Sequence, residues 1–353
     1  MIDWFSIIRE LAASADQAAD QVFRRFSEPD SLHVLPYRGF ANQQNAYIEG
    51  RVLEPKIIAE ALKETSSLQN FWNMLKQLES DEVAFCPIQV SFDGQTYQVQ
   101  ADEEGYFRLT IPVAQSTHEK WITAAITIPE SYLPKRKRNQ SSGEILQLHP
   151  ETSIGIISDL DDTVLKSYVD NPIKGATELL FKNAATREAF EGVAELYQTL
   201  YNGSATDIKQ PVFYLSSSPW NLYDFLCDFL SRNGLPKGPL FLKDYGFDRD
   251  KFFSPGHRHH KYTFIKKLCD VYPHMSFILI GDSTQHDASV YTWSVEQLAD
   301  RIAGIYIRDI AGKAESPKFQ EYKERCNKQN VEMVFFNHSD EVRKHATEKG
   351  WIT

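Results

Sequence analysis

The hydrophobic and polar positions follow two different patterns along the chain. Between residues 35 and 133, apolar and polar residues alternate, as at Ile88, Val90 and Phe92, and the dipeptide Asp93-Gly94 follows this run. A period of two is typical of half-buried antiparallel strands, and Asp-Gly favours a tight hairpin turn. We predict a small antiparallel β-sandwich-like domain here, with a scaffolding or recognition role. Apolar residues at helical spacing over 55–80 predict a helical insertion in it.

From residue 145 to 353 the pattern changes to short, wholly apolar runs separated by helical stretches. The runs are "IGIIS", "PVFYLS", "PLFLKD", "FILIGD", "AGIYIRD" and "EMVFFN". Strands that are apolar throughout and alternate with helices are typical of a parallel sheet with helices on both faces. We therefore predict a Rossmann-like α/β domain. Each of these runs ends in a polar residue, and in such sheets the binding crevice lies at the carboxyl ends of the strands.

Two flanking segments complete the predicted organisation. Residues 1–34 carry apolar positions at helical spacing and predict an amphipathic helix. Its polar face holds Asp16 and Asp20 instead of lysines, so packing on the protein's own body or on a second subunit is favoured over membrane binding. Residues 134–144 are basic and free of large apolar residues up to Glu144, which indicates a linker; its run from Lys135 to Arg138 could also attract an anionic surface.

Composition and charge exclude several classes of protein. The formal net charge of −10 argues against a general nucleic-acid binder, which needs a basic surface. The four cysteines are scattered without a C-x-x-C pair, so neither a disulfide framework nor a zinc site is expected, and a reducing, cytoplasmic location is indicated. No stretch reaches the roughly 18 apolar residues of a membrane span, and we expect no signal peptide.

Candidate chemistry is concentrated at the ends of the predicted parallel strands. Asp159 and Asp161 follow the first run, Ser216 the second and Asp282 the fourth, while Lys261 begins an apolar-periodic helix. Several carboxylates at one oxygen-rich site suit Mg²⁺, which offsets their mutual repulsion. Such a site lets one carboxylate attack phosphorus while a second acid donates and accepts a proton. We assign Asp159 as nucleophile, Asp161 as acid and base, and Asp282 as metal ligand.

Simpler interpretations exist for each motif. A D-x-D segment is often a helix cap or a turn, and "DLDDTV" resembles the start of a calcium loop, although Val164 stands where that loop needs glycine. Ser216 could cap the helix that follows Pro219. The histidine-rich "HRHH" at 257–260 is interpreted as a polar loop. The order of the acid, serine, lysine and G-D motifs after strand-like runs favours the phosphatase interpretation.

That order resembles the haloacid-dehalogenase-like phosphatase superfamily. The strings "SDLDDTVL", "YLSSSPWNLYDFL", "GPLFLKDYG", "HKYTFIKKL" and "ILIGDSTQHDASVY" narrow the resemblance to the catalytic domain of the actin-patch-associated phosphatidate phosphatase family, over about residues 145–325. The resemblance implies a haloacid-dehalogenase-like fold and Mg²⁺-dependent hydrolysis of phosphatidate to diacylglycerol and phosphate. It places catalytic roles on Asp159, Asp161 and Thr163, phosphate binding on Ser216 and Lys261, and metal binding on Asp159, Asp161 and Asp282. Asp287 corresponds to a trailing acid that supports the metal ligands.

The sequence therefore predicts a Mg²⁺-dependent phosphomonoesterase that works through an aspartyl-phosphate, with phosphatidate as the leading substrate. A phosphorylated lipid or another bulky phosphomonoester would be its partner, with peripheral contact to a membrane and no nucleic acid. One alternative is the same chemistry on a soluble phosphoester or a phosphoprotein. Another is a non-catalytic interaction module in which the carboxylates only hold Mg²⁺.

Overall fold

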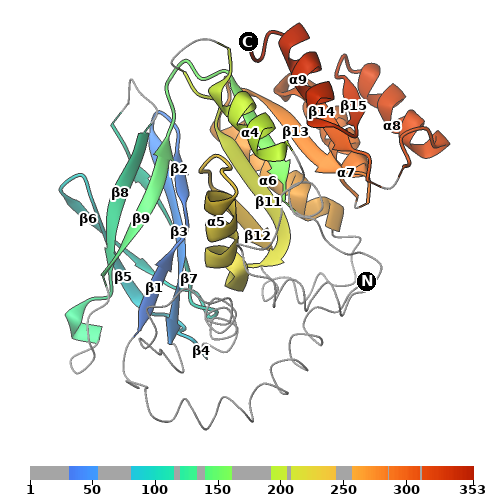
Figure 1. Ribbon diagram of the computed structural model, residues 1–353. Coiled ribbons are helices and arrows are strands. Elements are labelled where there is room, and N and C mark those ends of the chain that lie inside the picture. Colours follow the sequence, from blue (N-terminus) through green and yellow to red (C-terminus); the bar gives the residue numbers. More distant parts are fainter. Residues whose placement is uncertain are drawn as a thin grey trace.

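The computed structural model describes residues 32–54, 81–114, 120–132, 140–160, 192–204, 208–243, 257–284, 286–310 and 312–353. Within these ranges the chain is mixed α/β, with one largely antiparallel sheet and one parallel sheet packed side by side (Figure 1). No helix in the described ranges is both long and apolar enough to cross a membrane. The predicted N-terminal helix, up to residue 31, and the predicted insertion at 55–80 lie outside the described residues.

The antiparallel sheet is built from the first half of the chain. Its described strands are nine, and they are joined in the path β1-β3-β2-β9-β8-β5-β6, with β4 and β7 pairing onto β3. Their bounds are β1 His33–Pro36, β2 Gly39–Ala41, β3 Asn45–Glu54, β4 Asp81–Glu82, β5 Pro87–Phe92, β6 Gln95–Gln100, β7 Tyr106–Pro112, β8 Lys120–Thr127 and β9 Gln140–Gln147; a short 3₁₀ turn, η1, spans Glu130–Tyr132. The predicted hairpin is confirmed, because β5 and β6 pair around Asp93-Gly94 with both turn residues at positive φ.

Two predicted boundaries are wrong in this half of the chain. Residues 140–144, expected in the linker, and 145–147, expected in the second domain, together form β9. This strand pairs antiparallel with β8 and parallel with β2. Its buried residues Ile145 and Leu146 supply the reason, because joining the sheet removes them from water. At the other end, His33 and Val34 begin β1 and do not belong to a helix.

The parallel sheet contains all six strands that the apolar runs predict. Their order is β12-β11-β10-β13-β14-β15. The strands are β10 Ile154–Asp159, β11 Val212–Pro219, β12 Leu240–Lys243, β13 Ser276–Asp282, β14 Ile302–Arg308 and β15 Met333–Phe336. The described helices are α4 Val193–Asn202, α5 Tyr223–Arg232, α6 His257–Val271, α7 Asp287–Leu298, α8 Pro317–Asn327 and α9 Ser339–Glu348, with 3₁₀ turns at Trp220–Leu222 (η2) and Ala299–Arg301 (η4).

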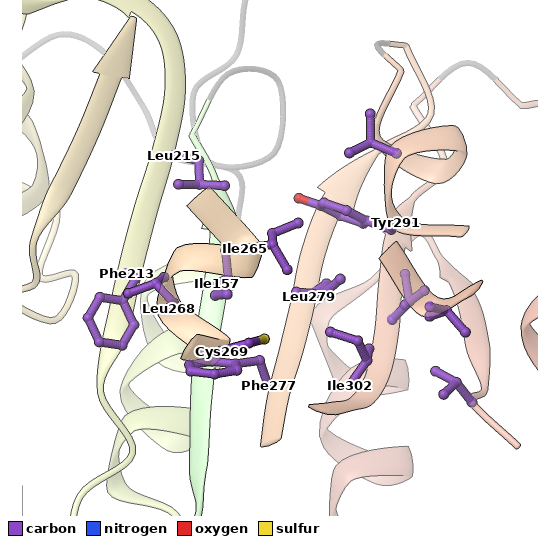
Figure 2. Close-up of a cluster of buried hydrophobic side chains, with 14 of the residues drawn as sticks. Ile157, Phe213, Leu215, Ile265, Leu268, Cys269, Phe277, Leu279, Tyr291 and Ile302 are labelled. Carbon is purple, nitrogen blue, oxygen red and sulfur yellow. The ribbon is translucent and has the colours of Figure 1, made fainter. Parts of the chain in front are cut away.

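Helices cover both faces of the parallel sheet, as the wholly apolar strands require. Successive side chains of a strand point to opposite faces, so Ile156 and Ile278 contribute to one core with α4, α5 and α9. Ile157 and Leu279 contribute to the other core with α6, α7 and α8. Figure 2 shows part of this second core, where Ile265 and Leu268 of α6 lie among the strand residues.

The two sheets share buried aromatic contacts. Tyr37, between β1 and β2, stacks on Trp220 at a ring-centroid distance of 4.0 Å. Phe40 of β2 packs edge-on against Phe213 of β11, with 6.3 Å between the ring centroids. The Tyr272 hydroxyl donates to the Ala41 carbonyl at 3.2 Å. These contacts join the cores of the two sheets, so the antiparallel sheet is packed along the flank of the parallel sheet.

Candidate active site

The central strands of the parallel sheet bring the predicted site residues to one edge. β10 lies between β11 and β13, and Asp159 at its end pairs in register with Leu215, the residue before Ser216. Asp282 ends β13 and pairs with Arg308 at the end of β14. Because all these strands are parallel, their terminal residues share the carboxyl edge where ligands bind in open α/β sheets.

Three carboxylates meet at this edge. Asp159, Asp282 and Asp287 are each 0% exposed, and one oxygen from each lies within 4.8 Å of the others. Buried carboxylates repel one another strongly because little water screens them, so such a cluster is stable only with cations close by. Three oxygen donors at this spacing fit a hard divalent cation such as Mg²⁺, which favours carboxylate ligands and keeps waters.

Lys261 of α6 supplies one positive charge to this cluster. Its Nζ lies 2.7 Å from Oδ1 of Asp159 and 2.5 Å from Oδ1 of Asp287. Burial by itself would lower the pKa of this ammonium, but the two carboxylates outweigh burial and raise the pKa above its usual value. Lys261 therefore stays charged at neutral pH and links the end of β10 to the start of α7.

Asp287 is held by two further contacts that orient its carboxylate. Its Oδ2 accepts a hydrogen bond from the backbone N–H of Asp282 at 3.1 Å. It also lies against Gly281, where a Cβ atom would come within 2.5 Å of Oδ2 of Asp287 and 2.8 Å of a ring carbon of Tyr291. Glycine is therefore required before Asp282 because a side chain there would occupy the space that Asp287 fills.

Replacing Gly281 by Ala is expected to displace Asp287 and to lower the free energy of unfolding by about 1–3 kcal/mol, the usual cost of overpacking. Thermal unfolding followed by circular dichroism measures this change. Ser276→Ala, at the partly exposed start of the same strand, is the matched control and should have little effect. Equal stabilities of the two variants would show that Asp287 moves away from Gly281 without cost.

Asp282 is oriented by a turn that the sequence analysis did not identify. Both the backbone N–H and the Oγ1 hydroxyl of Thr284 donate to Oδ1 of Asp282, each at 2.5 Å. A turn in which an aspartate side chain accepts a hydrogen bond from the residue two positions later is common. The sequence Asp282-Ser283-Thr284 was therefore sufficient to predict it. The two bonds fix the orientation of the Asp282 carboxylate.

Behind Asp159, a buried hydrogen bond ties its strand to helix α4. The hydroxyls of Ser158 and Tyr197 are 2.5 Å apart, and the Ser158 hydroxyl also donates to the Asp159 carbonyl at 2.8 Å. Burial raises the pKa of Tyr197, so its hydroxyl stays protonated at neutral pH and can donate. Tyr197 lies far along the chain from Asp159, and no local pattern indicates this contact.

Ser216 lies near the carboxyl end of β11, at the same edge of the parallel sheet as Asp159. Its side chain is 1% exposed, and its Oγ accepts a hydrogen bond from the backbone N–H of Ser218 at 3.0 Å. This bond is a local contact between a serine side chain and the backbone, of the kind that a capping interpretation predicts. The two interpretations of Ser216 are therefore compatible in this geometry.

Other sequence predictions concern residues outside the three-carboxylate cluster. Asp161 and Thr163 lie outside the described residues. Arg308, at the end of β14, is 6% exposed, with its guanidinium 4.9 Å from the ring centroid of Phe336. The "HRHH" segment is not a loop, because α6 begins at His257 and continues through Lys261.

Comparison with known proteins finds similarity over the segment that contains this site. Residues 154–309 match the family described as "Phosphatidate phosphatase APP1, catalytic domain". Phosphatidate phosphatase APP1 of Saccharomyces cerevisiae is 32% identical over 155 residues, which are 44% of this chain and 26% of the yeast protein. An uncharacterized protein of Schizosaccharomyces pombe is 29% identical over 223 residues, covering 61% of this chain and 34% of that protein.

These relatives are matched over only part of their length, since the chain covers about a quarter of one and a third of the other. A solved carbohydrate acetylesterase from Xanthomonas citri is similar at 10% identity and a TM-score of 0.28, over 77% of this chain and 66% of that one. That score is too low to assign a common fold. The family match therefore concerns the segment that contains Asp159, Lys261 and Asp282.

Proposed function

We propose that the chain is a Mg²⁺-dependent phosphatidate phosphatase, because residues 154–309 match the catalytic-domain family of phosphatidate phosphatase APP1. One observation carries the proposal. Inside the matched segment, three buried carboxylates gather within 4.8 Å at the carboxyl edge of the parallel sheet, with Lys261 in contact with two of them. A haloacid-dehalogenase-like fold for this domain is part of the same proposal.

Asp159 is the proposed nucleophile. It ends the central strand, and the Ser158–Tyr197 hydrogen bond holds the strand behind it, so its carboxylate is presented to the edge in one orientation. Lys261 at 2.7 Å keeps this carboxylate ionised, which nucleophilic attack requires. An oxygen of Asp159 attacks phosphorus, and the bond between phosphorus and the diacylglycerol oxygen breaks.

Asp161 is the proposed proton donor and acceptor. It gives a proton to the departing diacylglycerol oxygen and then removes one from the water that attacks the aspartyl-phosphate at phosphorus. That second attack breaks the bond between phosphorus and the Asp159 oxygen, releases inorganic phosphate and restores both carboxyl groups. Ser216 and Lys261 are proposed to bind the phosphoryl oxygens, and Thr163 is proposed to support Asp161.

Asp159 and Asp282, with the Asp161 main chain, would hold the Mg²⁺ ion, and Asp287 would orient Asp282 and Lys261. When bound, the cation would neutralise the carboxylates and polarise the phosphoryl oxygens. These residues fit Mg²⁺, because every donor is an oxygen and the Asp159, Asp282 and Asp287 carboxylates lie together at one edge of the sheet.

The direct test is phosphate release from phosphatidate dispersed in detergent micelles, with Mg²⁺ present and after EDTA treatment. We expect activity that EDTA abolishes and that added Mg²⁺ restores. A panel of soluble phosphomonoesters and a phosphopeptide at matched concentration is run in parallel. Faster hydrolysis of the soluble compounds than of phosphatidate would assign the same chemistry to a different substrate.

Mg²⁺ is also expected to stabilise the folded protein independently of activity. A ligand that binds only the folded state stabilises it by about 2.7 kcal/mol at a hundred times its Kd, which raises the unfolding temperature measurably. Asp282→Asn should remove most of this Mg²⁺-dependent shift because it deletes a charged ligand. An unchanged shift in the variant would place the cation elsewhere.

A further inference from the structure

The antiparallel sheet takes no part in the proposed chemistry, and it lies outside the segment that matches the phosphatase family, residues 154–309. The connection between β1 and β2, which holds Tyr37 and Arg38, nevertheless contacts the residues that follow Ser216 in the parallel sheet. Figure 1 shows α5, which begins shortly after Ser216, on the side of the parallel sheet that faces the antiparallel sheet. This contact therefore joins the first half of the chain to the neighbourhood of a proposed phosphate ligand.

The strand pairing around Ser216 is less regular than in the rest of β11. In the described ladder with β10, the last register pair is Asp159 with Leu215. On its other side, β11 pairs with β12 at Leu215 and again at Pro219, and the register shifts between these two residues. A bulge of this kind disrupts the ladder locally and re-aims the side chains within it. The position of Ser216 therefore depends on how the far end of this span, at Pro219, is held.

Trp220 anchors the far end of the span, because it directly follows Pro219 and is part of a buried aromatic cluster. Its ring stacks on Tyr37 of the antiparallel sheet, with 4.0 Å between the ring centroids and 20° between the ring planes. Tyr223 completes the cluster, at 4.7 Å from Tyr37 and 6.0 Å from Trp220. All three rings are buried, and aromatic pairs at such distances stabilise their arrangement beyond the area they bury.

The backbone around Tyr37 is bonded to both halves of the chain. The Tyr37 N–H donates to the Glu49 carbonyl of β3 at 2.9 Å. The next backbone N–H, that of Arg38, donates to the Tyr223 hydroxyl at the start of α5, at 2.6 Å. The ring of Tyr37 is therefore fixed relative to the antiparallel sheet and to the segment that it stacks on.

The span from Ser216 to Trp220 is too short to absorb a shift at one end. Three residues lie between them, and one of these, Pro219, has a fixed φ. Inside the span, Oγ of Ser216 accepts a hydrogen bond from the backbone N–H of Ser218 at 3.0 Å, which couples the serine side chain to the backbone ahead of it. A displacement of the Trp220 ring is thus transmitted to the Ser216 hydroxyl.

We propose that Tyr37 is a positioning residue for phosphate binding: by stacking on Trp220 it holds the end of β11 so that the Ser216 hydroxyl meets a phosphoryl oxygen. The antiparallel sheet thereby completes a phosphate site whose proposed ligands lie in the other half of the chain. This inference rests on the proposed function, because it takes Ser216 as a phosphate ligand. The simpler alternative is that the aromatic cluster only joins the two sheets, and phosphate affinity distinguishes the two interpretations.

Calorimetric titration of the full chain with inorganic phosphate, at saturating Mg²⁺, tests the proposal. Tyr37→Leu removes the ring and keeps an apolar side chain. It should weaken phosphate binding by about tenfold, the affinity equivalent of one aromatic pair. Tyr37→Phe keeps the ring and should bind phosphate as the parent does. Both variants should retain the Mg²⁺-dependent rise in unfolding temperature, because the carboxylate cluster does not include Ser216.

Phe40→Leu is the matched control, because Phe40 also joins the two sheets but contacts β11 within its regular ladder. Its ring lies 6.3 Å from that of Phe213, which pairs with Ile157 of β10. Phe40→Leu should lose stability in chemical denaturation much as Tyr37→Leu does, since both remove a buried ring, and it should still bind phosphate with the affinity of the parent.

Tyr223→Phe is a milder variant that keeps the test decisive if Tyr37→Leu does not fold. It deletes only the hydroxyl that accepts the hydrogen bond from the Arg38 N–H and leaves all three rings in place. Phosphate binding should weaken by about threefold, the affinity equivalent of one hydrogen bond of modest strength. Unchanged phosphate affinity in this variant would count against the proposal in the same way as for Tyr37→Leu.

The outcomes separate this inference from the proposed function. Equal phosphate affinity in Tyr37→Leu and its parent, or equal losses in Tyr37→Leu and Phe40→Leu, would overturn the role of Tyr37 and leave the cluster as a contact between the sheets. A parent protein that binds no phosphate would overturn it as well. Phosphate binding that depends on Tyr37, in a chain that hydrolyses no phosphatidate, would instead overturn the proposed substrate and leave the role of Tyr37 in place.

Discussion

Replacing Asp159 by Asn is expected to reduce phosphate release by at least about a thousandfold, a barrier increase of about 4 kcal/mol or more. An amide is nearly isosteric with the carboxylate, but it is a poor nucleophile and carries no charge to pair with Lys261 or a metal. Initial rates at saturating phosphatidate with Mg²⁺ measure the loss. Trapping of phosphate on the protein during turnover, followed by acid quench, should label the parent and leave the variant unlabelled.

Asp270→Asn is a suitable control for the Asp159 variant. Asp270 lies on α6 with its side chain 61% exposed and paired to Lys266 one helical turn away. Its replacement removes the same charge from the protein without touching the carboxyl edge, and its rate should stay near that of the parent. Substantial activity in Asp159→Asn, together with unlabelled parent protein, would refute the nucleophile assignment.

Lys261→Met is expected to lower the free energy of unfolding by about 3–5 kcal/mol, the typical cost of removing one partner from a buried charged pair. The methionine preserves much of the side-chain volume, so the loss reports on charge. Asp159 and Asp287 would then face each other without the ammonium that now lies 2.7 Å and 2.5 Å from them. Chemical denaturation at neutral pH without metal measures the change.

The pH dependence of the Lys261 effect has a definite sign. The two carboxylates raise the pKa of Lys261 in the folded state, so its pairing stabilises fully below the usual lysine value of 10.5 and is lost as pH rises through the higher folded value. The stability difference between parent and variant should therefore be constant from neutral pH to about 10.5 and narrow above it. A difference that already narrows near neutral pH would contradict the assignment.

Lys266→Met is the matched control on the same helix. Lys266 is 49% exposed and paired with Asp270 in water, where salt and hydration screen the interaction. Its replacement should change stability little. A loss as large as that of Lys261→Met would indicate that α6 responds to any lost lysine and not to the carboxylate cluster.

The six parallel strands and the acids at two of their ends were predictable from the sequence. A wholly apolar run of four to six residues can only be satisfied by burial on both faces, and the polar residue that ends it has to stand at the sheet edge. Local chemistry was sufficient for the Asp93-Gly94 hairpin as well. It was also sufficient to suspect Asp159 and Asp282, because several carboxylates at the ends of neighbouring buried strands favour binding a cation.

What the sequence alone could not decide is which of these elements become neighbours. The strand order sets β10 between β11 and β13, and this order brings Asp159 beside Asp282 although more than a hundred residues separate them. The contacts of Lys261 with Asp159 and Asp287, the bond from Tyr197 to Ser158, and the place of β9 in the first sheet follow from packing. The period of the hydrophobic positions indicates which residues of a strand or helix are buried, and this is a local property. Which strands and helices become neighbours depends on how their faces pack together in space.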